Sequence, residues 1–166
     1  FKERADTFAA EMSRTLHIQV ETRKPDDMVK ESDIVITATT AKTPVFDGNL
    51  VNQGTHLNLI GSFKPDVREV DDVVIRKAKV VVDQKRAALE EAGDIIVPLR
   101  AGIITEERIY AELGELVTGV KPSRTADSEI TLFKSVGLGI QDCATAWLAY
   151  TKAKEKRIYR EVDLFG

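Results

Sequence analysis

The chain has 166 residues with 24 basic and 27 acidic side chains, a formal net charge of −3, 43% hydrophobic residues and 31% charged residues. This length and balance are typical of one globular domain that can bury a hydrophobic core. The mixed, near-neutral charge argues against a protein that coats nucleic acid or binds membranes through basic segments. No apolar run approaches the roughly 18 residues that span a bilayer. From the charge balance and the apolar runs together, we expect neither a nucleic-acid nor a membrane partner.

Cysteine and histidine are scarce. The single cysteine, Cys143, excludes an intramolecular disulfide and a site of several thiolates. Its apolar neighbours predict a buried thiol, which is consistent with a reducing compartment such as the cytoplasm. His17 and His56 lie in strand-like runs without the spacing of metal ligands, so we expect structural roles for both and no metal site.

The first residues read as the interior of a helix. Phe1, Ala5, Phe8 and Met12 recur at helical spacing over residues 1–14, but no capping residue precedes them and the chain does not begin with Met. We therefore expect this sequence to be the later part of a longer chain.

Strands and helices then alternate. The apolar patterns predict strands over 17–21, 33–38, 56–60 and 79–83, and helices from Pro25 to residue 32, over 66–77 and over 84–92. Asp66 and Glu69 have the spacing of a variant capping box at the start of the helix over 66–77. The alternation predicts an α/β fold with a parallel sheet flanked by helices, whose ligands lie beyond the carboxyl ends of the strands.

The last third of the chain continues with less regular signals. We expect a helix over 105–117, a turn-rich segment, a strand over 130–133, a long helix over 135–157 and an edge strand over 158–165. Within the helix expected over 105–117, Glu112 and Glu115 are spaced for acid–base catalysis, but a solvated helix face accounts for them better.

Three segments follow strands and are candidates for ligand contact: 37–40, 61–64 and 83–85. The hydroxyl-rich run from residue 37 to residue 44 suits either a flat ligand approaching the backbone or an ordinary polar loop. Gly61 and Ser62 permit close approach of a backbone or a ligand. Gly137 and Gly139 resemble a dinucleotide loop, but Asp142 replaces the third glycine, so close packing of a helix is the better interpretation.

Several blocks occur in one order that is specific to a family. The segments ESDIVITATTAKTPVF, GTHLNLIGSFKPDVREVDD, KVVVDQKRAALEEAGDI and ELGELVTGVKPSRTADSEITLFKSVGLGIQDCATA resemble the ornithine cyclodeaminase/mu-crystallin family over nearly all of residues 1–150. The block GSFKPDVRE is most similar to its ketimine reductase and Δ1-pyrroline-2-carboxylate reductase branch.

The resemblance implies a fold and a division into domains. Family members are about twice as long and combine a Rossmann domain, which binds NAD or NADP, with a substrate and dimerisation domain. Residues 1–145 would be a partial Rossmann domain without its glycine-rich first βα unit. Residues 146–166 would be a helix and strand of the substrate and dimerisation domain, which is otherwise absent, and the full-length protein would be a homodimer.

The resemblance also implies cofactor-binding residues. These are Ala38, Thr39 and Thr40 on the ribose side, and Gly61, Ser62, Ser135, Val136 and Gly137 near the nicotinamide, with Ser135 able to hydrogen-bond its carboxamide. In ornithine cyclodeaminases an acid occupies the position of Phe63, and a phenyl ring cannot move a proton. Asp66 is the one nearby candidate for a catalytic acid, although a helix cap is the simpler role for it.

We therefore expect an NAD(P)-dependent oxidoreductase that reduces a cyclic ketimine, such as Δ1-pyrroline-2-carboxylate, to an amino acid. Lys64 is a local candidate for binding the substrate carboxylate. Ornithine cyclodeaminase and an alanine dehydrogenase-like activity are the alternatives among enzymes. A non-catalytic nucleotide-binding protein of mu-crystallin type is the alternative of another class.

Overall fold

The computed structural model describes residues 2–163. It divides into two compact units, one ending at Val136 and the other starting at Gly137. The first unit contains the sheet and most of the helices, and the second is built on one long helix.

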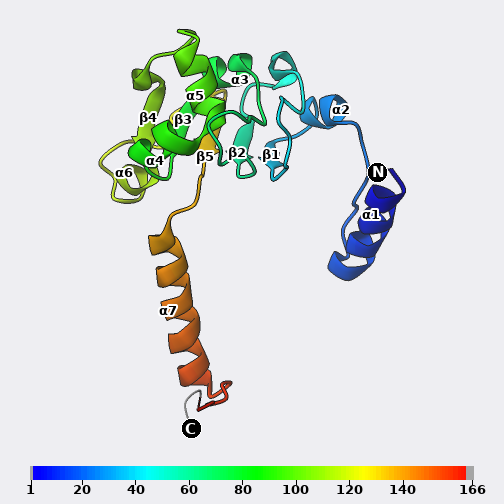
Figure 1. The fold of residues 1–166 in the computed structure, drawn as a ribbon. Helices are drawn as coiled ribbons and strands as arrows, with labels where there is room; N and C mark the ends of the chain where they lie inside the picture. Colours follow the sequence, from blue (N-terminus) through cyan, green and yellow to red (C-terminus); the bar gives the residue numbers. More distant parts are fainter. Residues whose placement is uncertain (1, 164–166) are drawn as a thin grey trace. The chain divides into compact units, whose positions relative to one another are not determined.

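The first unit is built on a parallel five-stranded sheet with the order β1-β2-β5-β3-β4 (Figure 1). Its strands are β1 (Ile34–Thr37), β2 (His56–Leu59), β3 (Lys79–Val82), β4 (Ile109–Glu112) and β5 (Thr131–Lys134). The predicted α/β fold with a parallel sheet flanked by helices is confirmed. Strand β5 lies between β2 and β3 although it comes last in the chain, so the connection from β4 to β5 runs back past β3.

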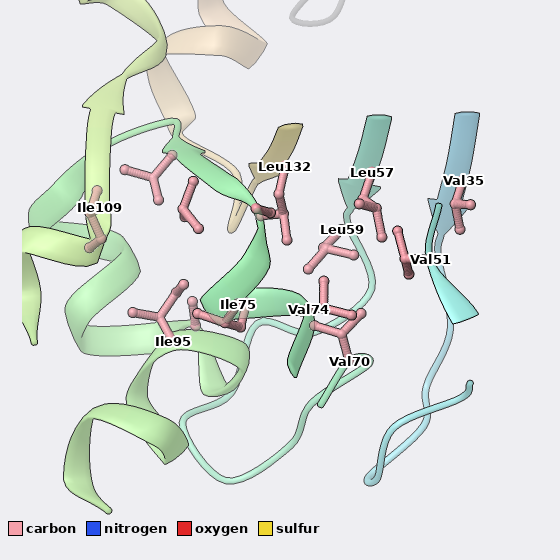
Figure 2. Packing of buried hydrophobic residues seen from close by; sticks show 14 of the residues in the cluster. Val35, Val51, Leu57, Leu59, Val70, Val74, Ile75, Ile95, Ile109 and Leu132 are labelled. Atoms are coloured by element: carbon pink, nitrogen blue, oxygen red, sulfur yellow. The ribbon is translucent and has the colours of Figure 1, made fainter. Parts of the chain in front are cut away.

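The core packs against one face of this sheet. Every second residue of each strand faces it, as in Val35 of β1, Leu57 and Leu59 of β2 and Leu132 of β5. Figure 2 shows these side chains against Val70, Val74, Ile75 and Ile95, which come from the segment around α3 (Asp72–Lys77) and from α5 (Gly93–Arg100). Helix α4 (Lys85–Glu91) adds Ala88 to the same layer.

The amino-terminal part differs from the prediction at one strand. Helices α1 (Lys2–Leu16) and α2 (Pro25–Val29) form as expected, but residues 17–21 form no strand. His17 ends α1 with a φ of 55°, and Ile18 is exposed. Alternating residues make a strand only when a neighbour pairs with them, and no segment of the described chain does so here.

The helix expected over 66–77 begins six residues later, at Asp72. Asp71 is its N-cap, with its side chain accepting a hydrogen bond from the Val74 N–H. Asp66 caps nothing and is exposed. The Glu69 carboxylate does not complete a capping box, because it bonds to the loops after β1 and β2 instead.

The helix expected over 84–92 forms as α4, which ends at Glu91, and Gly93 begins the next helix, α5. A side chain at Gly93 would overlap the backbone oxygen of Val67, so glycine lets α5 approach the loop before α3 closely.

The prediction of one helix over 105–117 is wrong. That segment is a short 3-10 helix (Glu106–Arg108), strand β4 and helix α6 (Leu113–Val117). Ile109 and Ala111 are buried at alternate positions, so packing beside β3 outweighs the helical charge pattern.

The second unit contains α7 (Gly139–Lys156), which ends at Arg157 with a φ of 54°. Cys143 is exposed on this helix, so the expectation of a buried thiol is wrong. Residues 158–163 form no strand, contrary to the expected edge strand, and the rest of that strand lies outside the described residues. Between residues 2 and 163, no helix combines the length and apolar character needed to cross a membrane.

Candidate functional site

The carboxyl ends of four strands lie at one edge of the sheet. Thr37 of β1 pairs in register with Leu59 of β2, Leu59 pairs with Lys134 of β5, and Lys134 pairs with Val82 of β3. The residues directly after these strands therefore come together, and they include seven of the predicted cofactor-binding residues. We name this set, Ala38–Thr40, Gly61–Ser62 and Ser135–Val136, the carboxyl edge. Gly137 belongs to the second unit and has a φ of 84°.

A buried carboxylate joins the first two loops of the carboxyl edge. Glu69 is completely buried, and its Oε1 accepts a hydrogen bond from the Thr39 N–H at 2.7 Å. Its Oε2 accepts bonds from the Gly61 N–H and the Thr37 hydroxyl, both at 2.8 Å. Burial by itself would raise the pKa of Glu69, but the bonds from Thr39, Thr37 and Gly61 outweigh burial and lower it. Glu69 is therefore an ionised acceptor between two loops.

A second buried carboxylate supports the first. Asp94 Oδ1 accepts hydrogen bonds from the backbone N–H groups of Glu69 at 2.7 Å and Val70 at 3.1 Å. Its Oδ2 lies 3.3 Å from Lys134 Nζ, and neither side chain of this pair is exposed. Burial raises the pKa of Asp94, while Lys134 and the two N–H groups oppose the rise.

Lys134 extends this network to the β2 loop. Its ammonium donates to the backbone oxygens of Leu59, at 3.3 Å, and Ser62, at 2.5 Å. Ser62 is itself buried, and its hydroxyl donates to the Val67 backbone oxygen at 2.6 Å. The loop after β2 is thus held by β5 and by the segment that precedes α3.

Asp83, at the end of β3, holds the loop after β5. Its Oδ2 accepts hydrogen bonds from the Ser135 hydroxyl at 3.0 Å and from the Val136 N–H at 2.9 Å. Because the Ser135 hydroxyl gives its hydrogen to Asp83, its oxygen lone pairs can accept a bond from a ligand amide.

The carboxyl edge offers neutral groups rather than fixed charges. Thr39, Thr40 and Ser135 supply hydroxyls. The carboxylates nearest the strand ends, those of Glu69, Asp83 and Asp94, are buried. This donor set suits the uncharged carboxamide and ribose of a nicotinamide cofactor. It contains no cation for a diphosphate, so these residues fit the nicotinamide side of such a cofactor.

The loop between Ser62 and Glu69 carries three exposed side chains. Lys64 Nζ lies 5.9 Å from the centre of the Phe63 ring, and Asp66 is exposed nearby in sequence. An exposed aromatic ring and an ammonium can contact a small apolar ligand with a carboxylate. Phe63 itself provides no group that transfers a proton.

Other candidates lie elsewhere. A hollow of about 640 Å³ is lined by His56, Lys79, Arg124 and Phe133 among others, and it contains none of the predicted site residues. Glu112 and Glu115 cap α6, with Glu115 accepting from the Glu112 N–H at 2.8 Å. His56 is bonded to the Thr131 hydroxyl at 2.8 Å, which fits the structural role expected for it. Among the described residues, no cluster of three or more histidine, cysteine or acidic side chains could hold a metal ion.

From the sequence, Glu69 was expected only to cap a helix, and Asp94 and Lys134 were given no role. A signal was present, because Asp94 precedes the apolar run IIVPL and Lys134 follows the strand-like run ITLF. A charge within a buried run requires a partner. The sequence does not show which charge pairs with which, since Asp94 and Lys134 are far apart in the chain.

Known proteins match this chain over most of its length. A sequence profile of the ornithine cyclodeaminase/mu-crystallin family matches residues 1–157. The Δ1-pyrroline-2-carboxylate reductase of Bacillus cereus is 42% identical over 142 residues, which are 85% of this chain and 43% of the relative. The ketimine reductase mu-crystallin of Mus musculus is 34% identical over 149 residues, which are 90% of this chain and 44% of the relative.

A solved structure agrees with these matches. The Δ1-pyrroline-2-carboxylate reductase of Thermococcus litoralis, in complex with NADH and L-proline, superposes with a TM-score of 0.90 at 47% identity. The superposition covers 96% of this chain and 50% of that one. The chain therefore spans about half the length of the relatives that it matches.

Proposed function

Because this chain belongs to the ornithine cyclodeaminase/mu-crystallin family, we propose that the protein containing it is an NAD(P)-dependent oxidoreductase that reduces a cyclic ketimine. The proposed substrate is Δ1-pyrroline-2-carboxylate or a similar imine with a carboxylate. The observation that carries the proposal is the convergence of the loops after β1, β2 and β5 at the carboxyl edge. The related reductase of Thermococcus litoralis, which binds NADH and L-proline, supports the choice of cofactor and product.

We propose that the carboxyl edge binds the nicotinamide side of NAD or NADP. Ala38, Thr39 and Thr40 would contact the ribose side, and Gly61, Ser62, Val136 and Gly137 would line the nicotinamide. Ser135 would accept a hydrogen bond from the carboxamide, with its hydroxyl oriented by Asp83. A bound reduced nicotinamide supplies a hydride, and the chain supplies binding and orientation.

The loop after β2 favours imine reduction over ornithine cyclisation. Where cyclodeaminases have an acid, this chain has Phe63, whose exposed ring can contact an apolar ring of the substrate. Lys64, beside it, would attract the substrate carboxylate. Asp66 is exposed three residues after Phe63 and is the only acid of this loop before Glu69, so we propose it as the candidate for proton supply.

We further propose a domain assignment and an assembly. Residues 1–145 would belong to the NAD(P)-binding domain and residues 146–166 to the substrate and dimerisation domain. Helix α7 exposes Ile140, Trp147, Leu148 and Tyr150, which supports burial against a further domain or a second subunit in a homodimer. The free thiol of Cys143 is compatible with a reducing compartment, and we propose the cytoplasm.

A chimera tests the function. In it, this chain replaces the matching 43% of the Bacillus cereus reductase. We expect NADH- or NADPH-dependent formation of proline from Δ1-pyrroline-2-carboxylate and no ammonia from ornithine. Ammonia release would favour a cyclodeaminase. Cofactor binding without turnover of any imine, in a chimera whose parent enzyme is active, would favour a non-catalytic binding protein.

A further inference from the structure

We propose that Glu69 is a positioning residue that fixes the shape of the carboxyl edge by holding the backbone N–H groups of Thr39 and Gly61. The role in cofactor binding rests on the proposed function, whereas the hold on the two loops does not. Glu69 touches neither cofactor nor substrate in this account. It acts through the loops that would touch them.

The geometry assigns one backbone N–H to each carboxylate oxygen. Oε1 accepts from Thr39, and Oε2 accepts from Gly61. Thr39 follows β1 and Gly61 follows β2, so one side chain fastens two loops from neighbouring strands. An ionised carboxylate suits this arrangement because both of its oxygens are acceptors.

The two loops meet without space between them. A side chain at Gly61 would overlap the backbone N and O of Thr39 and the Glu69 carboxylate. The close approach brings two backbone N–H groups toward the same buried point, where an N–H without an acceptor is costly. Glu69 satisfies both groups at that point.

Glu69 is itself held in place. Asp94 accepts a hydrogen bond from its backbone N–H, and Lys134 links Asp94 to the Ser62 backbone oxygen. The backbone of Glu69 is therefore anchored, and its carboxylate holds the two loops from that point. This rigidity separates a positioning role from simple filling of the interior.

The test is Glu69→Gln in the 166-residue chain without cofactor. A glutamine has one acceptor oxygen, so only one of the two backbone N–H groups keeps its partner. The glutamine NH₂ can donate to the Thr37 hydroxyl on the Oε2 side, which leaves the Gly61 N–H unpaired. We expect amide hydrogen exchange, measured by NMR, to rise about tenfold or more at Gly61 while Thr39 stays protected.

Ile75→Val is the matched control. Ile75 is buried in the core, away from these hydrogen bonds, so the variant lowers global stability without singling out Gly61. Unchanged exchange at Gly61 in Glu69→Gln would overturn the proposal. If that variant does not fold, the unsubstituted chain decides: slow exchange at both Thr39 and Gly61 supports the hold, and exchange like that of an open loop overturns it.

A cofactor measurement tests the second part in the chimera. Glu69→Gln should raise the Kd for NADH about tenfold, and Ile75→Val should leave it unchanged. Faster exchange at Gly61 with an unchanged Kd would overturn the link to the cofactor. If the unsubstituted chimera binds no NADH, the proposed function fails, while the exchange experiment still decides whether Glu69 holds the loops.

Discussion

The ammonium of Lys134 lies 3.3 Å from the carboxylate of Asp94, and both side chains are completely buried. Removing one partner of such a pair leaves a buried charge without compensation. We predict that Lys134→Met lowers the free energy of unfolding by about 3–5 kcal/mol, measured by urea denaturation at neutral pH.

The same variant has a control and a dependence on pH. Lys85→Met removes a surface ion pair with Glu106 and should cost less than about 1 kcal/mol. Burial already raises the pKa of Asp94, and loss of Lys134 would raise it further. A raised acid pKa means that the folded protein holds its proton more tightly than the unfolded chain. The loss of unfolding free energy in Lys134→Met should therefore shrink as the pH falls. A deficit equal to that of Lys85→Met would contradict the role of the pair.

Gly61 tests the close approach of the two loops. Gly61→Ala places a methyl group against the Thr39 backbone and the Glu69 carboxylate, so we predict a loss of about 1–3 kcal/mol in unfolding free energy. Gly114→Ala is the matched control, because the residue is helical and its added methyl meets no atom within 4 Å beyond its chain neighbours and its own helix backbone. The free energy of unfolding of Gly114→Ala should rise by about 0.5–1 kcal/mol. Equal effects of the two substitutions would show that the loops are not tightly packed.

Ser135 tests the proposed contact with the cofactor. In the chimera, Ser135→Ala removes an oriented acceptor, and we predict a rise of about threefold to tenfold in the Kd for NADH, measured by fluorescence titration. Ser123→Ala, a change near the amino end of β3, should leave the Kd as it was. The proposed contact would be wrong if both variants bound NADH as tightly as the parent.

Glu129 gives the chain a predictable sensitivity to acid. Its hydrogen bonds with Lys79 and then with Thr125 lower its pKa from 4.5 to about 2. A lowered acid pKa contributes stability above the ordinary value, and that stability is lost as the pH falls from 4.5 toward 2. We predict that Glu129→Gln and Lys79→Met both flatten the dependence of the thermal midpoint on pH in this window. An unchanged slope in both variants would contradict the assignment.

The fold could be predicted where the sequence pattern has one interpretation. The runs at Ile34–Thr37, Lys79–Val82 and Thr131–Lys134 are short and rich in apolar residues, and each forms a strand within one residue of its predicted position. The segment before α6 was misread, because TEERIYAEL carries charges at helical spacing while Ile109 and Ala111 alternate toward β3. The sequence does not show that β3 lies beside this segment, and that contact decides between strand and helix.

The candidate site was predictable to a similar extent. The rule that ligands lie at the carboxyl ends of parallel strands placed residues 37–40, 61–64 and 83–85 at one edge, and the family resemblance added residues 135–136. The strand register confirms that the ends of β1, β2, β3 and β5 converge there. Their roles in cofactor binding stay predictions. The support beneath them was not predictable, because Glu69 has the local spacing of a helix cap. Two of its true partners, Thr37 and Thr39, are about 30 residues away.

Hydrogen exchange of the chimera, with and without saturating NADH, tests most directly whether the carboxyl edge holds the cofactor. We predict that NADH slows exchange in peptides covering residues 37–41, 60–63 and 134–136. Peptides around His56 and Arg124, which line the hollow away from that edge, should exchange at the same rate in both samples. Saturable NADH binding that leaves the three carboxyl-edge peptides unchanged, or that protects the hollow instead, would contradict the account.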